Sequence, residues 1–294
     1  MCKYLVYSLI AAFYLLLVSC GGGSDSSSSS SSSTTPVSTS ASFKTCNSSQ
    51  SVTNPSKPLN QVDAFGSYAI SQEIWDPAQA SSWSQCTNTT IDNKTGVSST
   101  FTWNMVNSGY NVVSFPNILF GLHAGLTPSS STPLLPTKIS SLPNLVATGS
   151  IASQCAVAGC TYNTGFDIFT GKTAAGGPTW PSAELMIFTS YQQSSDVTTW
   201  PNIVGRVSIG GVQWLIRHLT PQHPATSGVA DTYSGTFYYA LTPVTNLNLN
   251  IKDFITDAVS RGYIDTSDYL SVIELGTEII NGSGSTTITN YQIQ

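Results

Sequence analysis

The chain has 294 residues, of which only 9% are charged, and its formal net charge is −5. This sparse and slightly acidic charge argues against a partner that is a nucleic acid, because phosphate contacts need clustered lysine and arginine. The many serine, threonine, asparagine, tyrosine and tryptophan residues are instead typical of a secreted β-protein that binds neutral polar ligands.

The N-terminus predicts export. One early lysine precedes an apolar run from Tyr4 to Val18, which is too short for a transmembrane helix and matches a secretory signal. The sequence Leu17-Val18-Ser19-Cys20 resembles a bacterial lipobox, in which the cysteine is lipidated and becomes the mature N-terminus. We therefore expect residues 1–19 to be a lipoprotein signal peptide, and Cys20 to anchor an exported bacterial lipoprotein in the outer membrane or at the cell surface. An ordinary signal peptide with an incidental cysteine is the alternative.

Residues 20–41 are predicted to form a tether. Almost all of them are glycine, serine or threonine, and Ser26–Ser33 is an unbroken serine run. A segment of this composition buries no apolar surface, so it is expected to be a flexible linker that spans on the order of 25 Å between its ends. Residues 42–294 are long enough for one domain with a substantial core.

Four cysteines remain once the N-terminal ones are set aside: Cys46, Cys86, Cys155 and Cys160. An even number indicates disulfide bonds in an oxidising compartment. Of the three possible pairings we predict Cys46–Cys86, which would fix the N-terminal segment to a sheet, and Cys155–Cys160, which would close a small loop between strands. Zinc ligation is the alternative, but paired Cys-x-x-Cys units are absent from the sequence. We therefore expect no metal and no other cofactor, and we interpret the scattered histidines as surface or locally bonded residues: His123, His218 and His223.

Most of the domain is predicted to be β-strand. Ten short segments are rich in valine, isoleucine, threonine and aromatic residues and are divided by turn residues. They are Tyr68–Trp75, Ser99–Met105, Asn111–Phe115, Gly165–Phe169, Ala183–Thr189, Val204–Ile209, Gln213–His218, Gly235–Leu241, Leu270–Thr277 and Thr286–Ile293. Many short strands at close spacing indicate an all-β sandwich or barrel.

One stretch has the periodicity of a helix instead. Its apolar residues fall on a single helical face: Ile251, Phe254, Ile255, Ala258 and Val259. Asn250 and Asp253 suit the N-terminus of a helix, and Gly262 suits its end. We therefore expect one amphipathic helix packed on the outside of a two-sheet β-domain.

The chain contains only four glutamates: Glu73, Glu184, Glu274 and Glu278. Three of them interrupt apolar strand-like runs. A charge buried without a partner in such a run is costly, so it normally faces a wet cleft or belongs to a network. If the first run is a regular strand, Glu184 shares one face with Met186 and Phe188, while Leu185 and Ile187 face the core. Core packing is an equally good interpretation of Met186 and Phe188 on periodicity alone.

Five motifs follow one another along the chain. They are Tyr68–Trp75, Val113-Ser114-Phe115-Pro116-Asn117, Phe166-Asp167-Ile168-Phe169, Glu184-Leu185-Met186-Ile187-Phe188, and Gly276-Thr277-Glu278 followed by Asn281-Gly282-Ser283-Gly284. The last four are similar to Ser-Tyr-Pro-Asn, Tyr-Asp-Leu-Phe, Glu-Leu-Met-Ile-Trp and Gly-Thr-Glu-Pro-Phe-x-Gly-x-Gly. Together the motifs resemble glycoside hydrolase family 12, the endo-β-1,4-glucanases and xyloglucanases, and they cover most of residues 60–294.

The resemblance implies a β-jelly roll of two curved antiparallel sheets, with a concave substrate cleft and one packed α-helix. It also implies a retaining mechanism, with Glu184 as nucleophile, Glu278 as acid/base and Asp167 orienting the nucleophile. Retaining glycosidases hold the two carboxyl groups only about 5–5.5 Å apart. We therefore expect ionised Glu184 to raise the pKa of Glu278. Trp75 matches a family tryptophan that contacts the glucan.

This chain departs from the family pattern beside the expected site. Gln72 and Glu73 stand where the family has two asparagines, Glu274 replaces a glutamine, and Phe188 replaces a tryptophan. The expected substrate-binding residues are Trp75, Glu73, Met186, Phe188 and Glu274. If the four glutamates and Asp167 line one groove, like-charge repulsion is expected to raise several of their pKa values.

The expected activity is retaining, endo-acting hydrolysis of internal β-1,4-glucosidic bonds by a monomer. The substrate would be a β-glucan polysaccharide or oligosaccharide, with cellulose, mixed-linkage glucan and xyloglucan as the candidates. Two alternatives remain. The same jelly roll could be a catalytically weakened glycan-binding or adhesion lipoprotein, because fold does not fix function. It could also be a xylanase of the same clan.

Overall fold

The computed structural model describes residues 39–49, 62–74, 76–107, 109, 111–123, 130–174, 181–220 and 233–294. The first described strand begins at Ser40. The predicted signal peptide, Cys20, most of the linker, Trp75 and His223 lie outside the described residues. In the described part of the chain, no helix has the length and apolar character needed to cross a membrane.

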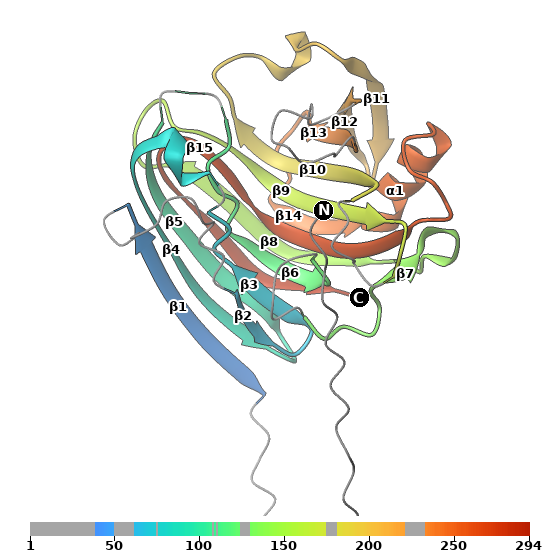
Figure 1. Cartoon of the computed structure of the whole chain (residues 1–294), viewed down its shortest axis with the longest axis horizontal. Helices are drawn as coiled ribbons and strands as arrows, with labels where there is room; N and C mark the ends of the chain where they lie inside the picture. Colours follow the sequence, from blue (N-terminus) through green and yellow to red (C-terminus); the bar gives the residue numbers. More distant parts are fainter. Residues whose placement is uncertain are drawn as a thin grey trace, which may run out of the picture. The chain divides into compact units, whose positions relative to one another are not determined.

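Fifteen strands form most of the described domain (Figure 1). They are β1 (Ser40–Ser48), β2 (Val62–Phe65), β3 (Tyr68–Ser71), β4 (Ala80–Asp92), β5 (Gly96–Asn107), β6 (Asn117–Gly121), β7 (Thr137–Lys138), β8 (Val146–Cys155), β9 (Thr161–Gly171), β10 (Ala183–Gln192), β11 (Ile203–Ile209), β12 (Val212–Leu219), β13 (Ser234–Ala240), β14 (Asn246–Asn250) and β15 (Tyr269–Ile293). The helices are α1 (Ile251–Ser260) and three short 3-10 turns, η1 (Pro77–Gln79), η2 (Ile139–Ser141) and η3 (Val197–Thr199).

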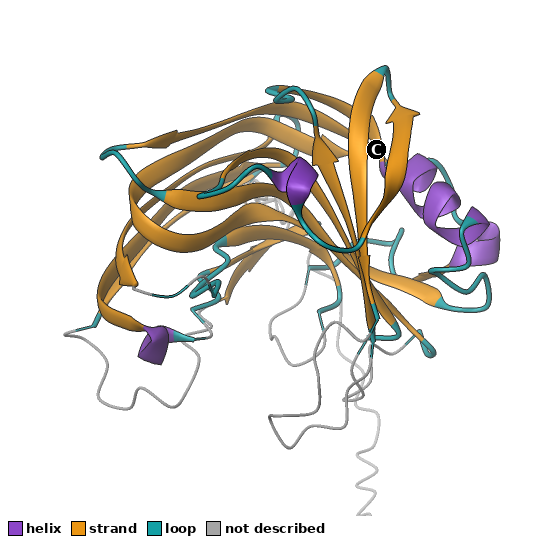
Figure 2. Ribbon diagram, turned by 90° about the horizontal axis from the view of Figure 1, so that it is seen from above, coloured by secondary structure: helices purple, strands orange, loops and turns teal. Residues whose placement is uncertain are grey.

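The strands form two curved sheets (Figure 2), and β15 pairs within both of them. The first sheet has the order β1-β4-β5-β15-β8-β14, and the second has the order β2-β3-β6-β15-β9-β10-β13-β12-β11, with β7 beside the start of β15. Residues 269–281 of β15 pair within the second sheet, and residues 282–293 pair within the first. One strand therefore connects the two layers of the sandwich.

The all-β jelly-roll class with one packed helix is confirmed, although several details differ from the expectation. The pair β10–β13 is parallel, whereas both sheets were expected to be wholly antiparallel. The strand predicted at 111–115 is wrong, because only an isolated bridge at Ser114 forms there and the strand begins at Asn117, after Pro116. Proline has no N–H to donate to a ladder, which explains this late start.

The core lies between the two sheets and continues under α1. Leu185 and Ile187 of β10 are fully buried in it, as the alternation in this strand predicts. The apolar face of α1 is buried as predicted, and its Phe254 packs edge-on against Trp214 of β12, with 4.9 Å between ring centroids. Gly262 ends the helix in the left-handed conformation, with φ of 75°. The helix thus packs against the core-facing side of the strands at one end of the second sheet.

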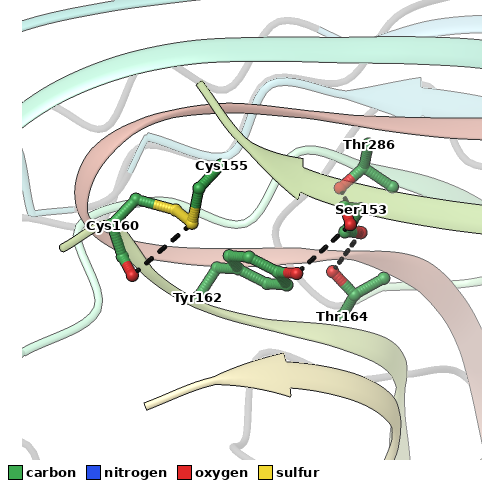
Figure 3. Close-up of a disulfide and its surroundings, with 6 residues drawn as sticks. All are labelled: Ser153, Cys155, Cys160, Tyr162, Thr164 and Thr286. Carbon is green, nitrogen blue, oxygen red and sulfur yellow. Dashed lines mark hydrogen bonds between the residues drawn. A yellow bond between two sulfur atoms is a disulfide. The ribbon is translucent and has the colours of Figure 1, made fainter. Parts of the chain in front are cut away.

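Both predicted disulfide bonds are present. Cys46 and Cys86 are directly opposite each other in the β1–β4 ladder, so this bond joins the N-terminal strand to the first sheet. Cys155 and Cys160 close the turn between β8 and β9 (Figure 3). The second bond links a strand of the first sheet to a strand of the second, close to the point where β15 passes between them.

A cluster of hydroxyl groups lies beside this second disulfide. The Ser153 hydroxyl is 2.8 Å from that of Thr164 and 2.7 Å from that of Thr286, and Tyr162 donates to the Ser153 carbonyl at 3.3 Å (Figure 3). Thr277 continues the cluster, because its hydroxyl lies 3.0 Å from that of Thr164 and 2.7 Å from that of Thr286. Buried hydroxyl groups that satisfy one another hold β8, β9 and β15 in a fixed register.

Candidate active site

One face of the second sheet carries a group of carboxylates. Glu274 of β15 lies directly opposite Asp167 of β9, and Asp167 lies directly opposite Met186 of β10. Opposed residues share a face of a sheet, and so does every second residue along each strand. Glu278 and Glu184 therefore lie on the same face as Asp167. We call this the carboxylate face; it is the side of the second sheet turned away from the core between the sheets.

Glu278 is held by an amide network at one end of this face. Its carboxylate accepts a hydrogen bond of 2.6 Å from Asn163 Nδ2, and Asn163 is the residue opposite Glu278 in the β9–β15 ladder. Asn163 Oδ1 in turn accepts from Gln193. Two neutral amides thus fix the Glu278 side chain without neutralising it by a cation. Glu278 stays partly exposed, as a group that exchanges protons with a substrate requires.

Burial raises the pKa of Glu278 to about 7, although the hydrogen bond from Asn163 opposes the rise. The direction of this shift is the expected one, and its largest cause is desolvation of the Glu278 carboxyl group rather than the charge that was expected to produce it. A carboxyl group with this pKa is protonated for much of the time near neutral pH, which suits a general acid.

Asp167 lies among the other carboxylates. Burial raises its pKa well above the ordinary value, and the charges of Glu184, Glu274, Glu73 and Glu278 raise it further, in that order. Asp167 Oδ1 is buried and has no hydrogen-bond partner among the described residues. The predicted crowding of charges is therefore confirmed for Asp167, which carries a proton more readily than an exposed aspartate.

Glu73 reaches the same group from the segment after β3. Its carboxylate accepts from Asn117 Nδ2, which also donates to Glu274 Oε2 at 3.2 Å. The strand predicted over 68–75 is wrong beyond Ser71, because Glu73 has φ of 39° and this left-handed conformation interrupts the strand. The alternation that placed Glu73 and Trp75 on one face therefore does not apply. Burial, followed by the charge of Glu274, raises the pKa of Glu73 to about 8.

His123 completes this group, and sequence reasoning missed it. Its Nδ1 pairs with Glu274 Oε1, and its ring lies edge-on to Phe169 with 5.3 Å between ring centroids. Burial lowers the pKa of His123, but the charge and hydrogen bond of Glu274 outweigh burial and raise it to about 9. No local motif marks this residue, because its partner is 151 positions further along the chain. Its position two residues after β6 is the only signal that the sequence offered.

Glu73, His123 and Glu274 also place three possible metal-ligand atoms within 4.8 Å of one another. These atoms are occupied by the ion pair of His123 with Glu274 and by the hydrogen bonds from Asn117. A protonated histidine is not a ligand, since ligation needs the neutral imidazole. We therefore assign the three residues as an ion-paired cluster rather than as metal ligands.

Aromatic residues pack around the β10 and β13 part of the carboxylate face. Met186 and Phe188 share this face with Glu184, as predicted, but they are 2% and 1% exposed. Phe188 packs against Tyr239, with 4.9 Å between ring centroids, and Trp200 lies edge-on to the same tyrosine at 5.7 Å. Core packing therefore describes Met186 and Phe188. Trp200 is partly exposed, and the guanidinium of Arg217 lies over its ring.

Three comparisons with known proteins agree with this geometry. The sequence model of Glycosyl hydrolase family 12 matches residues 66–294. Endoglucanase S of Pectobacterium parmentieri is 27% identical over 237 residues, which are 77% of this chain and 81% of the relative. A protein of Phytophthora nicotianae named inactive glycoside hydrolase XLP1 is 25% identical over 238 residues, which are 79% of this chain and 87% of that protein.

Among solved structures, the family 12 xyloglucanase from Bacillus licheniformis in complex with ligand has a TM-score of 0.68 and 25% sequence identity. The match covers 85% of this chain and 99% of the xyloglucanase. The described domain therefore has the same fold over nearly the whole length of that enzyme.

Proposed function

The chain belongs to glycosyl hydrolase family 12, and we infer that it is a glycosidase that cleaves internal β-1,4-glucosidic bonds of a glucan. One observation carries this inference beyond the family match. Glu184 and Glu278 lie on the same face of the second sheet, and the pKa of Glu278 is about 7. A retaining glycosidase needs two carboxyl groups, one ionised as the nucleophile and one protonated as the acid.

In the proposed first step, Glu184 attacks the anomeric carbon of the bound glucan. The new bond between this carbon and a Glu184 carboxylate oxygen forms as the glycosidic C–O bond breaks, and Glu278 gives its proton to the departing oxygen. In the second step Glu278 removes a proton from water, which attacks the same carbon and releases Glu184. Two inversions leave the configuration of the sugar unchanged. Asp167, whose pKa the charge of Glu184 raises, is proposed to hold Glu184 in position through a shared proton.

The substrate class is proposed to be a plant-type β-1,4-glucan. The relatives named above include an endoglucanase and a xyloglucanase, whose names denote enzymes that cleave glucan and xyloglucan. The face that would receive the chain offers uncharged hydrogen-bonding groups, such as the side-chain amide of Asn163. Neutral sugar hydroxyl groups suit these donors and acceptors.

We expect the purified domain to release reducing ends from mixed-linkage β-glucan, carboxymethyl cellulose or xyloglucan, and to do so much faster than from xylan. Nuclear magnetic resonance of the first products should show the β-anomer, because the mechanism retains configuration. Faster release from xylan would replace the glucanase by a xylanase of the same clan. A folded domain that releases nothing from any of these polysaccharides would favour a glycan-binding protein, as the relative named inactive exemplifies.

We also propose that Cys20 carries a lipid anchor, on the basis of the sequence Leu17-Val18-Ser19-Cys20 and the serine-rich stretch behind it. In a bacterial host, the full chain is expected to incorporate labelled palmitate and to sediment with membranes. The Cys20→Ser variant should lose the label and remain soluble, because it lacks the thiol that would be acylated. Equal labelling of the parent and the variant would contradict the anchor.

A further inference from the structure

The ion pair between His123 and Glu274 joins two strands of the second sheet. Leu119 of β6 lies opposite Glu274, and Gly121 lies opposite Val272, so the chain leaves β6 on the carboxylate face. His123 follows two residues later and directs Nδ1 at Glu274 Oε1. Its location is therefore fixed by the β6–β15 ladder as well as by the pair itself.

The two members of the pair differ sharply in exposure. The Glu274 side chain is 0% exposed, whereas the His123 side chain is 20% exposed. Both Glu274 oxygens are occupied, since Oε1 faces His123 and Oε2 accepts from Asn117. Glu274 was expected to bind the substrate directly, but a fully buried carboxylate cannot touch a polysaccharide. Only the histidine ring can do so.

The His123 ring contacts a residue that is paired with the proposed nucleophile in the sheet. The ring contacts Phe169, and Phe169 is the residue directly opposite Glu184 in the β9–β10 ladder. Glu274, at the other side of the ring, lies directly opposite Asp167. In the described part of the chain His123 is bonded through Nδ1 and its ring is partly exposed, so Nε2 is the atom through which the ring could reach a ligand.

We propose that Glu274 is a positioning residue that holds His123 as an imidazolium, and that His123 Nε2–H donates a hydrogen bond to a hydroxyl group of the glucan next to the bond that is cleaved. This rests on the proposed glucanase function. A charged donor forms a stronger hydrogen bond to a neutral hydroxyl than a neutral imidazole does, and the bond to Glu274 prevents the ring from turning. Glu274 would thus affect substrate binding at this subsite through His123, without contacting the substrate itself.

The charges around the ring agree with this assignment. Glu274 of β15 and Glu73, from the segment after β3, face His123, and both raise its pKa. The strand β9 presents the uncharged Phe169 to the ring and places Asp167 opposite Glu274, while β10 places Glu184 opposite Phe169. Among these groups, Glu274 contributes most to raising the pKa of His123, through its charge and its hydrogen bond.

The test compares KM for a soluble β-glucan at about pH 5.5 and about pH 8, on either side of the ordinary histidine pKa. In the parent, His123 stays protonated at both values and KM should be nearly equal. In Glu274→Gln the ring loses its proton between the two values, so KM is expected to be about fivefold higher at the upper pH. In His123→Ala, KM should be about tenfold higher at both, with kcat much less affected.

His218→Ala serves as the matched control, because it removes a histidine that stacks on Tyr263. Arg217 and His218 are successive residues of β12 and so point to opposite sides of the second sheet. It is expected to keep the KM of the parent at both pH values. A KM for Glu274→Gln that does not change with pH would overturn the proposal, whatever the thermal stability of the variant. The parent is assayed first, so an inactive parent refutes the glucanase function, whereas an active parent with a pH-independent Glu274→Gln refutes only this inference.

Discussion

Glu184→Ala is expected to lower kcat/KM for β-glucan by several orders of magnitude while the domain remains folded. The variant lacks the oxygen that attacks the anomeric carbon, so no glycosyl-enzyme can form. Glu184 lies on the carboxylate face with its neighbours Leu185 and Ile187 buried in the core, and the substitution leaves this packing intact. Reducing-sugar release, with thermal unfolding measured in parallel, checks the expectation.

Rescue of Glu184→Ala by a small nucleophile should distinguish a catalytic role of Glu184 from a structural one. Azide can occupy the space left by the Glu184 side chain and attack the same carbon, and a single inversion then yields an α-glycosyl azide. Rescue with this product is expected for an aryl glycoside whose leaving group needs no proton. Asp253→Asn, on the exposed side of α1, is the matched control and should retain full activity. Residual activity above roughly a tenth of that of the parent would rule Glu184 out as the nucleophile.

Glu278→Gln is expected to have the second largest effect, a loss of roughly 10²- to 10⁴-fold in kcat on glucan. The variant cannot protonate the departing oxygen, so the loss should be far smaller for an aryl glycoside that leaves as a stable phenolate. The test is the ratio of kcat on the two substrates. A variant that is equally impaired on both would contradict the role of Glu278 as the acid.

The pH dependence of activity is a second test of the role of Glu278 as the acid. Glu278 acts as an acid only while protonated, and burial raises its pKa to about 7. On the alkaline side of the profile, activity of the parent should therefore fall as the pH rises through about 7. In Glu278→Gln this fall should be absent, because glutamine does not ionise. A parent whose kcat/KM stays constant up to about pH 9 would show that another group supplies the proton.

Glu274→Gln is the matched control for Glu278, since the two glutamates share one strand and one face. Glu274 is fully buried and bonded to His123, whereas Glu278 is partly exposed and accepts a hydrogen bond from the neutral amide of Asn163. The Glu274 carboxylate is engaged by His123 and Asn117, so it is not placed to protonate the departing oxygen. The control should therefore keep the fall in kcat above about pH 7 that depends on Glu278, whatever its KM.

Short-range patterns in the sequence were enough to predict much of the fold. The alternation in Ala183–Thr189 placed Glu184 on one face and Leu185 on the other, because a strand between two layers must bury one side. The apolar stripe of α1 and the Cys155–Cys160 bond depend on residues close in sequence, whereas the even number of cysteines indicated disulfide bonds without fixing which pairs form.

The features that were not predicted depend on contacts between residues far apart in the chain, which local sequence patterns do not reveal. The two strands predicted at Leu270–Thr277 and Thr286–Ile293 are parts of the single strand β15, which continues through the residues between them. Gly282 has φ of 82°, and a Cβ at this residue would lie 2.5 Å from that of Cys160, so glycine is required by a neighbour rather than by a turn. His123 was missed for the same kind of reason, because the carboxylate that gives it a role is 151 residues away.

β15 lies later in the sequence than every strand with which it pairs. Its residues pair with β5, β6, β7, β8 and β9, so neither layer has its central strand until residues 269–293 are in place. Glu278 is carried by that same strand. These pairings join segments far apart in the chain, and contacts of this kind form late in folding. The sandwich therefore closes and receives its proposed catalytic acid in one step, so a partly folded domain without β15 has neither.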